Sequence, residues 1–213
     1  MRRWPLAVGL ATLAAAWGGP MLWQWRDSVL AHMVAHMAVV AVAAPLIAIG
    51  IGRLPLASSR ETVSPFLLSL PVIASLVELV VVWGWHVPAA RALAATTLSG
   101  TIAEQASFFL AGVFLWNACL NGREETGGDV AGAFGLLLTS IHMTLLGALL
   151  SLAARPLYGS GQVSCFGLTL DAGQDQQLGG IVMLLVGAAV YLAGGIVLLA
   201  RVLEARPRRK AVL

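Results

Sequence analysis

The sequence predicts an all-α membrane protein, a polytopic bundle of transmembrane helices. Hydrophobic residues make up 59% of the 213 residues and charged residues only 11%, whereas a soluble domain is nearer half apolar and a quarter charged. Apolar runs of about 20 residues recur along the chain, which is the length that a helix needs to cross the hydrocarbon core. These values exclude an ordinary soluble enzyme, and the net charge of +3 is too small for a nucleic-acid-binding surface.

Six transmembrane helices are expected, and each apolar run is bounded by charge, proline or glycine. The expected helices are residues 4–23, 28–50, 65–86, 99–120, 130–154 and 176–200. The boundaries that follow them are, in order, Arg26-Asp27, Gly50 to Arg53, Pro88, Gly122-Arg123, Arg155-Pro156 and Arg201. With neither an internal repeat nor a separate soluble segment, residues 1–213 are interpreted as a single integral membrane domain.

The distribution of basic residues predicts the orientation of these helices. Only Arg26, Arg91 and Arg155 fall on one side of the six expected spans. The ten on the other side are Arg2, Arg3, Arg53, Arg60, Arg123, Arg201, Arg206, Arg208, Arg209 and Lys210. Because cytoplasmic loops carry the excess of Lys and Arg, both termini are expected in the cytoplasm. The basic run at the C-terminus is interpreted as a segment attracted to anionic lipid headgroups.

The N-terminal segment admits two interpretations. Residues 1–17 combine Arg2-Arg3, an apolar run and the small residues Ala14 to Ala16, which is also the pattern of a secretory signal peptide. The apolar run continues as far as Trp23, so a retained transmembrane helix is preferred. Cleavage would leave five helices and would not alter the orientation of the rest.

Ionisable side chains inside the expected helices are the candidate functional residues, because charge is costly to place in a membrane. His32 and His36 are four residues apart on one face of the second helix, about 6 and 12 Å below the outer surface, a spacing suited to chelating one metal ion. His86 ends the third helix, Glu104 lies about 7 Å deep in the fourth, and Asp175 opens the sixth. Titratable side chains from four helices are therefore expected in the outer leaflet.

Deeper polar residues and methionines extend this set. Glu78 and His142 are candidates for inner ligands, for partners that orient an imidazole, or for a mutual hydrogen bond. Met33 and Met37 each follow a histidine directly, and imidazole with thioether favours Cu(I) over hard cations. The structural alternatives are packing for the methionines and hydrogen bonds between helices for the histidines.

Other motifs restrict the class of function. The chain has no zincin motif, no nucleophile elbow and no phosphate-binding glycine loop, so we do not expect an enzyme. Gly179-Gly180 is expected at a close contact between helices. Cys119 and Cys165 fall on opposite sides of the membrane in this topology, so they cannot form a disulfide with each other.

Four segments together resemble one membrane protein family. They are His32-Met33-Val34-Ala35-His36-Met37 with Ala44-Pro45-Leu46 and Gly50, then Trp85-His86-Val87-Pro88, then Gly147-Ala148-Leu149-Leu150 with Pro156-Leu157-Tyr158, and Asp175-Gln176-Gln177-Leu178-Gly179-Gly180. In this order and spacing they resemble the polytopic CtaG family of assembly factors for caa-type cytochrome c oxidases. The resemblance covers about residues 32–183.

This resemblance implies a helix bundle of the bacterial inner membrane that is needed to mature a haem-copper oxidase, through handling of copper on the outer side. It implies oxidase subunits or another copper-handling protein as partners, and it carries over His32, His36, His86 and Asp175 as functional candidates. The chain departs from the family at Gln105, because the family has a Glu-His pair where this sequence has Glu104-Gln105.

The leading hypothesis is therefore a non-enzymatic assembly factor with a Cu(I) site in the outer leaflet. Its expected ligands are His32, His36 and His86, with Met33 or Met37 as a softer auxiliary ligand. Glu104 is expected as a ligand or hydrogen-bond acceptor, His142 as an inner candidate ligand, and Asp175 as an attracting charge at the outer rim.

Two alternatives from other classes remain. A b-type cytochrome would need two histidines on different helices, such as His36 and His142, as axial haem ligands. A proton or ion transporter would use Glu78, Glu104 and His142 as a relay.

Overall fold

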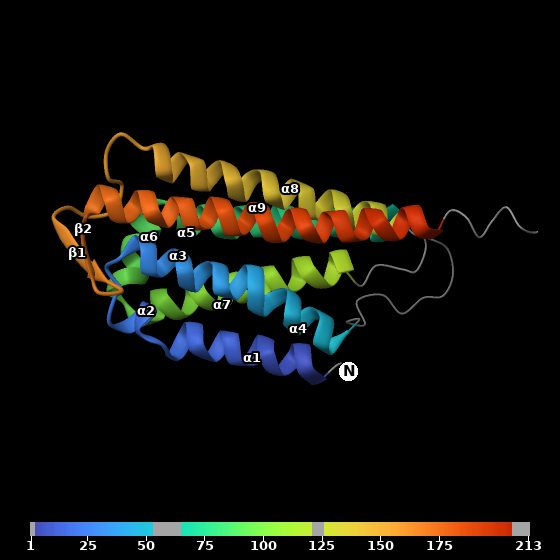
Figure 1. Ribbon diagram of the computed structural model, residues 1–213, viewed down its shortest axis with the longest axis horizontal. Coiled ribbons are helices and arrows are strands. Elements are labelled where there is room, and N and C mark those ends of the chain that lie inside the picture. The colour runs from blue at the N-terminus through green and yellow to red at the C-terminus, as the bar shows by residue number, and fades with distance from the viewer. Residues whose placement is uncertain (1–2, 53–64, 121–125, 206–213) are drawn as a thin grey trace, which may run out of the picture.

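The computed structural model describes residues 3–52, 65–120 and 126–205, and these residues fold into a bundle of long helices (Figure 1). The elements of the first half are α1 (Arg3–Gly18), α2 (Pro20–Trp23), α3 (Val29–Met37), the π-helical segment η1 (Ala38–Ala43), α4 (Ala44–Ile51), α5 (Pro65–Trp85) and α6 (Pro88–Thr96). Those of the second half are α7 (Leu98–Leu120), α8 (Thr126–Leu152), β1 (Gln162–Cys165), β2 (Leu168–Asp171) and α9 (Ala172–Ala205).

The prediction of an all-α polytopic bundle is confirmed. Within the described residues, five helices are long and apolar enough to cross a membrane, and a sixth span results if α5 and α6 are counted as one broken span. These two helices meet at an angle of 73°. The break falls at His86-Val87, because Pro88 lacks the backbone N–H that would continue α5 and disfavours helical backbone at the residue before it. The helix α6 was not expected from the sequence.

The second span, α3–η1–α4, changes from α-helix to π-helix at Ala38–Ala43. Pro45 follows this segment, and its ring removes a backbone donor and crowds the preceding turn. The Trp116 indole N–H on α7 donates to the Val40 carbonyl oxygen at 2.9 Å, so a carbonyl of the widened turn is paired from a neighbouring helix. π segments of this kind are frequent at functional sites, and this one begins two residues after His36.

Helices α8 and α9 run side by side for most of their length (Figure 1), and glycines set their closest approach. A Cβ atom on Gly147 would lie 2.7 Å from the Leu184 nitrogen, and one on Gly180 would lie 2.7 Å from the Ser151 nitrogen. Gly179, the neighbour of Gly180 on α9, contacts Val29 and Met33 of α3. The prediction that Gly179-Gly180 forms a close helix contact is therefore confirmed, with each glycine facing a different helix.

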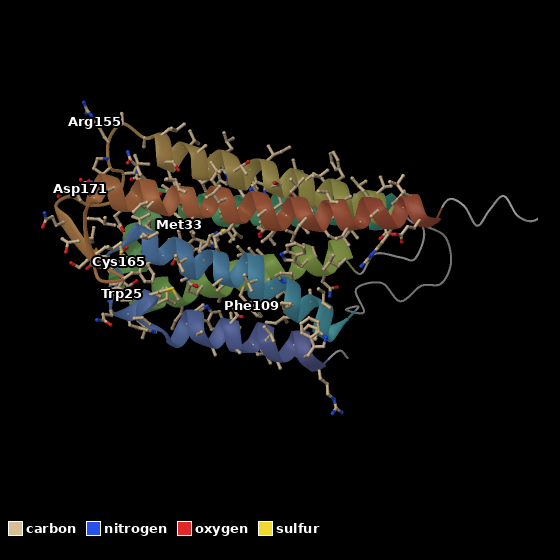
Figure 2. All side chains as sticks on the ribbon, in the orientation of Figure 1. Trp25, Met33, Phe109, Arg155, Cys165 and Asp171 are labelled. Carbon is tan, nitrogen blue, oxygen red and sulfur yellow. The ribbon has the colours of Figure 1, made fainter. Side chains whose placement is uncertain are left out.

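One end of the bundle, which we call the hairpin end, is formed by α2, α6, the β1–β2 hairpin and the first turns of α3 and α9 (Figure 1). The hairpin lies between the expected helices 130–154 and 176–200, and its strands are antiparallel. Phe166 and Gly167 turn the hairpin with φ of 50° and 77°, and the Phe166 ring packs on Trp25 with ring centroids 4.5 Å apart. Figure 2 shows Trp25, Cys165 and Asp171 together at this end.

Candidate functional site

Three imidazole rings meet inside the bundle near the hairpin end, and we call His32, His36 and His86 the histidine cluster. The ring centroids are 6.2 Å apart for His32 and His36, 5.7 Å for His32 and His86, and 5.5 Å for His36 and His86. All three side chains are buried, with at most 5% of their surface exposed. The structure therefore brings together three of the residues that the sequence singled out, from α3 and from the turn between α5 and α6.

The position of α3 is set by a cap that comes from another helix. Ser28 begins α3, and its hydroxyl accepts the Ala31 N–H at 3.1 Å. The Asp175 carboxylate of α9 accepts hydrogen bonds from the Ser28 hydroxyl at 2.6 Å and from the Val29 N–H at 2.6 Å. Because these contacts lie one turn before His32, they hold the first turn of the helix that carries two imidazoles.

His86 is held at both its side chain and its backbone. Its Nδ1 lies 2.6 Å from the Val82 carbonyl oxygen, which can only accept, so Nδ1 carries the proton and Nε2 keeps its lone pair. The Tyr158 hydroxyl donates to the His86 carbonyl oxygen at 2.7 Å. Burial raises the pKa of Tyr158 to about 12, so this phenol remains a hydrogen-bond donor throughout the neutral range.

The remaining nitrogens of the cluster are buried without hydrogen-bond partners among the described residues. They are both ring nitrogens of His32, both of His36, and Nε2 of His86. Phe108 of α7 packs against the cluster with its ring centroid 4.1 Å from that of His36, so the His36 side of the cluster is apolar. A buried polar atom without a partner costs about 1–3 kcal/mol, so five such nitrogens in one place make the histidine cluster the candidate site.

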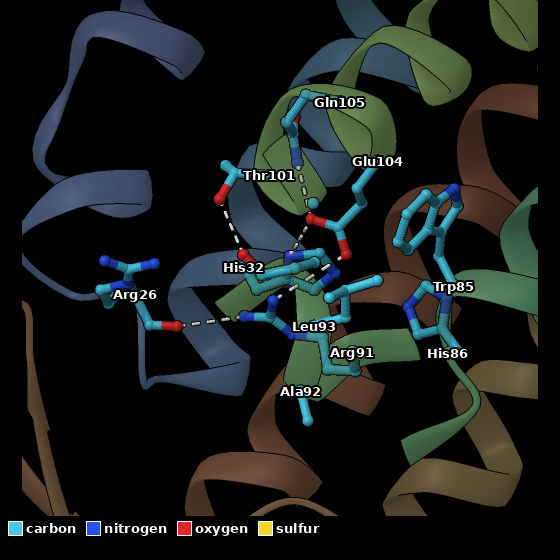
Figure 3. A network of polar contacts seen from close by, with 12 residues as sticks. Arg26, His32, Trp85, His86, Arg91, Ala92, Leu93, Thr101, Glu104 and Gln105 are labelled. Carbon is cyan, nitrogen blue, oxygen red and sulfur yellow. Dashed lines mark hydrogen bonds and ion pairs between the residues drawn. The ribbon is translucent and has the colours of Figure 1, made fainter. Parts of the chain in front are cut away.

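Glu104 and Arg91 form a charged pair beside the cluster (Figure 3). Glu104 Oε2 lies 3.7 Å from His32 Nδ1, and Glu104 Oε1 lies 3.9 Å from Arg91 Nη1. Arg91 Nη2 donates to the Arg26 carbonyl oxygen at 3.1 Å, which ties α6 to the turn before α3. Gln105 donates from Nε2 to Glu104 Oε2 at 3.3 Å.

Arg91 was not expected as a site residue; in the sequence it served only to predict the orientation of the helices. Two features of the sequence mark Arg91 as unusual. It is one of only three basic residues on the side expected to be extracytoplasmic, and it comes three residues after Pro88. Its position on α6, a helix that was not expected, is the reason that the pairing with Glu104 could not be foreseen.

Other candidate residues lie at helix contacts. Asp175 is 1% exposed and is engaged by the start of α3. Met33 is fully buried against Gly179 of α9, with its Cγ 3.1 Å from the position a Cβ would take there. Met37 is buried in the apolar core.

Glu78 and His142 lie outside the cluster. The Tyr191 hydroxyl of α9 donates to Glu78 Oε1 at 3.0 Å. His142 is buried on α8, and no ring contact joins it to the histidine cluster within the described part of the chain. Among the described residues, no hydrogen bond or ion pair joins Glu78, Glu104 and His142 to one another, so they do not form a connected relay.

With the side chains in their present positions, the described residues contain no group of three or more His, Cys, Asp or Glu side chains arranged to hold a metal ion. The histidine cluster nevertheless has the donor atoms for one, because three of its nitrogens, one on each ring, can present a lone pair without breaking a hydrogen bond seen here.

Comparison with known proteins agrees with the resemblance seen in the sequence. The model of one protein family, described as cytochrome c oxidase caa3 assembly factor (Caa3_CtaG), matches residues 1–205. No curated protein and no solved structure matches the chain. Because the family model covers nearly the whole sequence, the chain belongs to the cytochrome c oxidase caa3 assembly factors.

Proposed function

We propose that this assembly factor binds copper as Cu(I) at the histidine cluster and passes it to a haem-copper cytochrome c oxidase during assembly. The role is non-catalytic: the metal ion is cargo, and no bond of a substrate is made or broken. The observation that carries the proposal is the group of three buried imidazoles with five unpartnered nitrogens. Membership of an oxidase assembly family supports the choice of client.

The spacing of the rings supports a shared ion. A metal ion lies about 2.0–2.1 Å from an imidazole nitrogen, so three rings around one ion have their centres roughly 5.5 Å apart. The observed centroid separations are 5.5, 5.7 and 6.2 Å. Loading the site therefore requires the rings to turn, while the helices that carry them can stay in place.

The hydrogen bonds around the cluster suggest which nitrogen of each ring binds. His86 would bind through Nε2, since Nδ1 is engaged by the Val82 carbonyl oxygen. His32 would bind through Nε2 as well, with its Nδ1–H directed to Glu104, which then acts as an acceptor that orients the ring. Met33 or Met37 would serve as a soft auxiliary ligand only after turning away from its core contacts.

The position of the cluster near the hairpin end supports exchange of the ion with a partner. His32 lies only one helical turn from Ser28, where α3 begins, so the route to the membrane surface is short. The distribution of basic residues favours the extracytoplasmic side for this end. We propose an oxidase subunit or another copper-handling protein of the bacterial inner membrane as the partner there.

The decisive experiment measures Cu(I) stoichiometry on purified protein with a competing chelator. We expect one ion per chain in the wild type and none in His32→Ala/His36→Ala, because two of three ligands are lost. His142→Ala is the matched control, since it removes a buried imidazole outside the cluster and should keep the ion. Equal stoichiometry in the double variant and the wild type would overturn the proposal, and a Soret band in the purified protein would support the haem alternative instead.

The client is tested in cells. A deletion strain should lose oxidase activity and regain it with the wild-type gene but not with His32→Ala/His36→Ala. Added copper should partly restore activity in the deletion strain, because excess metal bypasses a delivery step. Normal oxidase activity in the deletion strain would exclude the oxidase as client.

A further inference from the structure

A buried cation stands beside the site that we propose to bind a cation. Arg91 is 8% exposed, and its guanidinium is held by the Arg26 carbonyl oxygen and by Glu104 (Figure 3). Glu104 in turn contacts His32, so the fixed positive charge is separated from a ligand of the proposed site by one carboxylate. A positive charge at this distance weakens the binding of any cation, so its presence requires a reason.

When both members are ionised, the Arg91–Glu104 pair beside the cluster carries no net charge. Arg91 carries +1 and Glu104 carries −1, while each imidazole must be neutral in order to offer a lone pair. Asp27 and Arg26 also act on Arg91, with opposite sign. Phe108 and the apolar core pack against the cluster and supply no charge. The Asp175 carboxylate, one turn before His32, accepts hydrogen bonds from the Ser28 hydroxyl and from the N–H groups of Val29 and Leu30.

A neutral, dry site discriminates between ions by their charge. The cost of moving an ion from water into a medium of low dielectric constant grows with the square of its charge, so it is about four times larger for a divalent ion than for a monovalent ion of similar size. A free carboxylate would offset part of that cost, and more so for the divalent ion. Here Arg91 already neutralises the carboxylate of Glu104.

We propose that the Arg91–Glu104 pair makes the histidine cluster selective for a singly charged metal ion over a divalent one. The inference rests on the proposed function and adds to it the residue that sets the specificity. Arg91 touches neither the ion nor its ligands, and it acts by cancelling the charge of Glu104. Cu(I) would be accepted, whereas Zn(II), which binds readily to three histidines in other proteins, would be disfavoured.

The test compares Cu(I) and Zn(II) affinities of the purified full chain. Both ions have a filled d shell, so charge is the main difference between them. Arg91→Gln frees the Glu104 carboxylate, and we expect the Zn(II) to Cu(I) affinity ratio to rise roughly tenfold or more. Arg91→Lys keeps the charge and should keep the wild-type ratio. Arg155→Gln, which removes an exposed charge at the same end, is the matched control and should leave the ratio unchanged.

Two further variants keep the test decisive if Arg91→Gln is unstable with its unpaired carboxylate. Glu104→Gln leaves Arg91 unopposed, and the ratio should fall below that of the wild type. Arg91→Gln/Glu104→Gln removes both charges together, leaves no buried unpaired ion, and should return the ratio near the wild-type value. The Zn(II) to Cu(I) affinity ratio should therefore be highest in Arg91→Gln, intermediate in the wild type and the double variant, and lowest in Glu104→Gln. A change of charge predicts this order, whereas a general loosening of the fold does not.

The outcomes separate this inference from the function on which it rests. If the wild type binds Cu(I) but the ratio does not differ between Arg91→Gln and Arg155→Gln, or between Glu104→Gln and the double variant, charge selection by Arg91 is wrong and the copper site stands. If the wild type binds neither ion, both proposals fall.

Discussion

Individual side chains at the hairpin end hold the ligand-bearing segments from outside their own helices. Asp175 was expected as an attracting charge at the outer rim, whereas the structure buries its carboxylate against the first turn of α3. The Tyr158 hydroxyl holds the backbone of His86 by donating a hydrogen bond to its carbonyl oxygen. Neither residue belongs to the histidine cluster, yet the geometry of the cluster depends on both.

At this scale we predict that Asp175→Asn destabilises the protein by about 1–2 kcal/mol, because an amide has one acceptor oxygen where the carboxylate uses two. The Cu(I) affinity should fall as well, since the first turn of α3 loosens. Thermal unfolding in detergent and chelator competition measure the two effects.

Asp129→Asn is the control for this change. Asp129 also lies in a first helical turn, that of α8, so its substitution removes the same helix-terminal charge far from the cluster. If both variants lose equal stability and neither loses Cu(I) affinity, the cap has no bearing on the site.

At the scale of elements, close helix contacts fix the relative positions of α3, α8 and α9. Gly180 of α9 packs against the backbone of α8, and Gly179 of α9 packs against α3. The helix α9 therefore takes part in both contacts. α9 also carries Asp175. A shift of α9 would therefore move the cap of α3 and with it the two imidazoles.

We expect Gly180→Ala to lower the free energy of unfolding by about 1–3 kcal/mol, because the new methyl group would lie 2.7 Å from the Ser151 nitrogen and the helices must separate. Gly84→Ala is the matched control on α5. Among the described residues, no atom of another helix lies within 4 Å of a Cβ there, so alanine should be neutral or stabilising by up to about 1 kcal/mol. Thermal unfolding of both variants checks this, and equal stability losses would show that the contact at Gly180 is not tight.

At the scale of the whole molecule, the positive-inside pattern makes a prediction about orientation. In a background of Cys119→Ser and Cys165→Ala, a cysteine at Ser160 should react with a membrane-impermeant maleimide added to intact cells, because the hairpin end is expected outside. A cysteine at Gly127, at the opposite end of α8, should react only after the membrane is opened. The reverse labelling would invert the orientation and place the histidine cluster on the cytoplasmic side.

The sequence was sufficient for the helices and for the face that carries His32 and His36, since hydropathy and a spacing of four residues are local properties. It could not reveal α6, because this helix is short and adjoins a turn whose direction depends on packing. It also could not pair Arg91 with Glu104 or Asp175 with Ser28, because those contacts join residues far apart in the chain. The π-helical segment escaped prediction for the same reason, as its carbonyl is paired by Trp116 from α7.

The wide turn at Ala38–Ala43 has an evolutionary consequence. A π turn accommodates a surplus residue within an otherwise regular helix, so the second span can lose one residue there and revert to a uniform α-helix. His32 and His36, which precede the π-helical segment, and Pro45, which follows it, would then stay on the same faces of the helix as before. We therefore expect homologous chains to differ by a single-residue gap near Val42, whose side chain is 38% exposed, and to differ far less in length between His32 and His36.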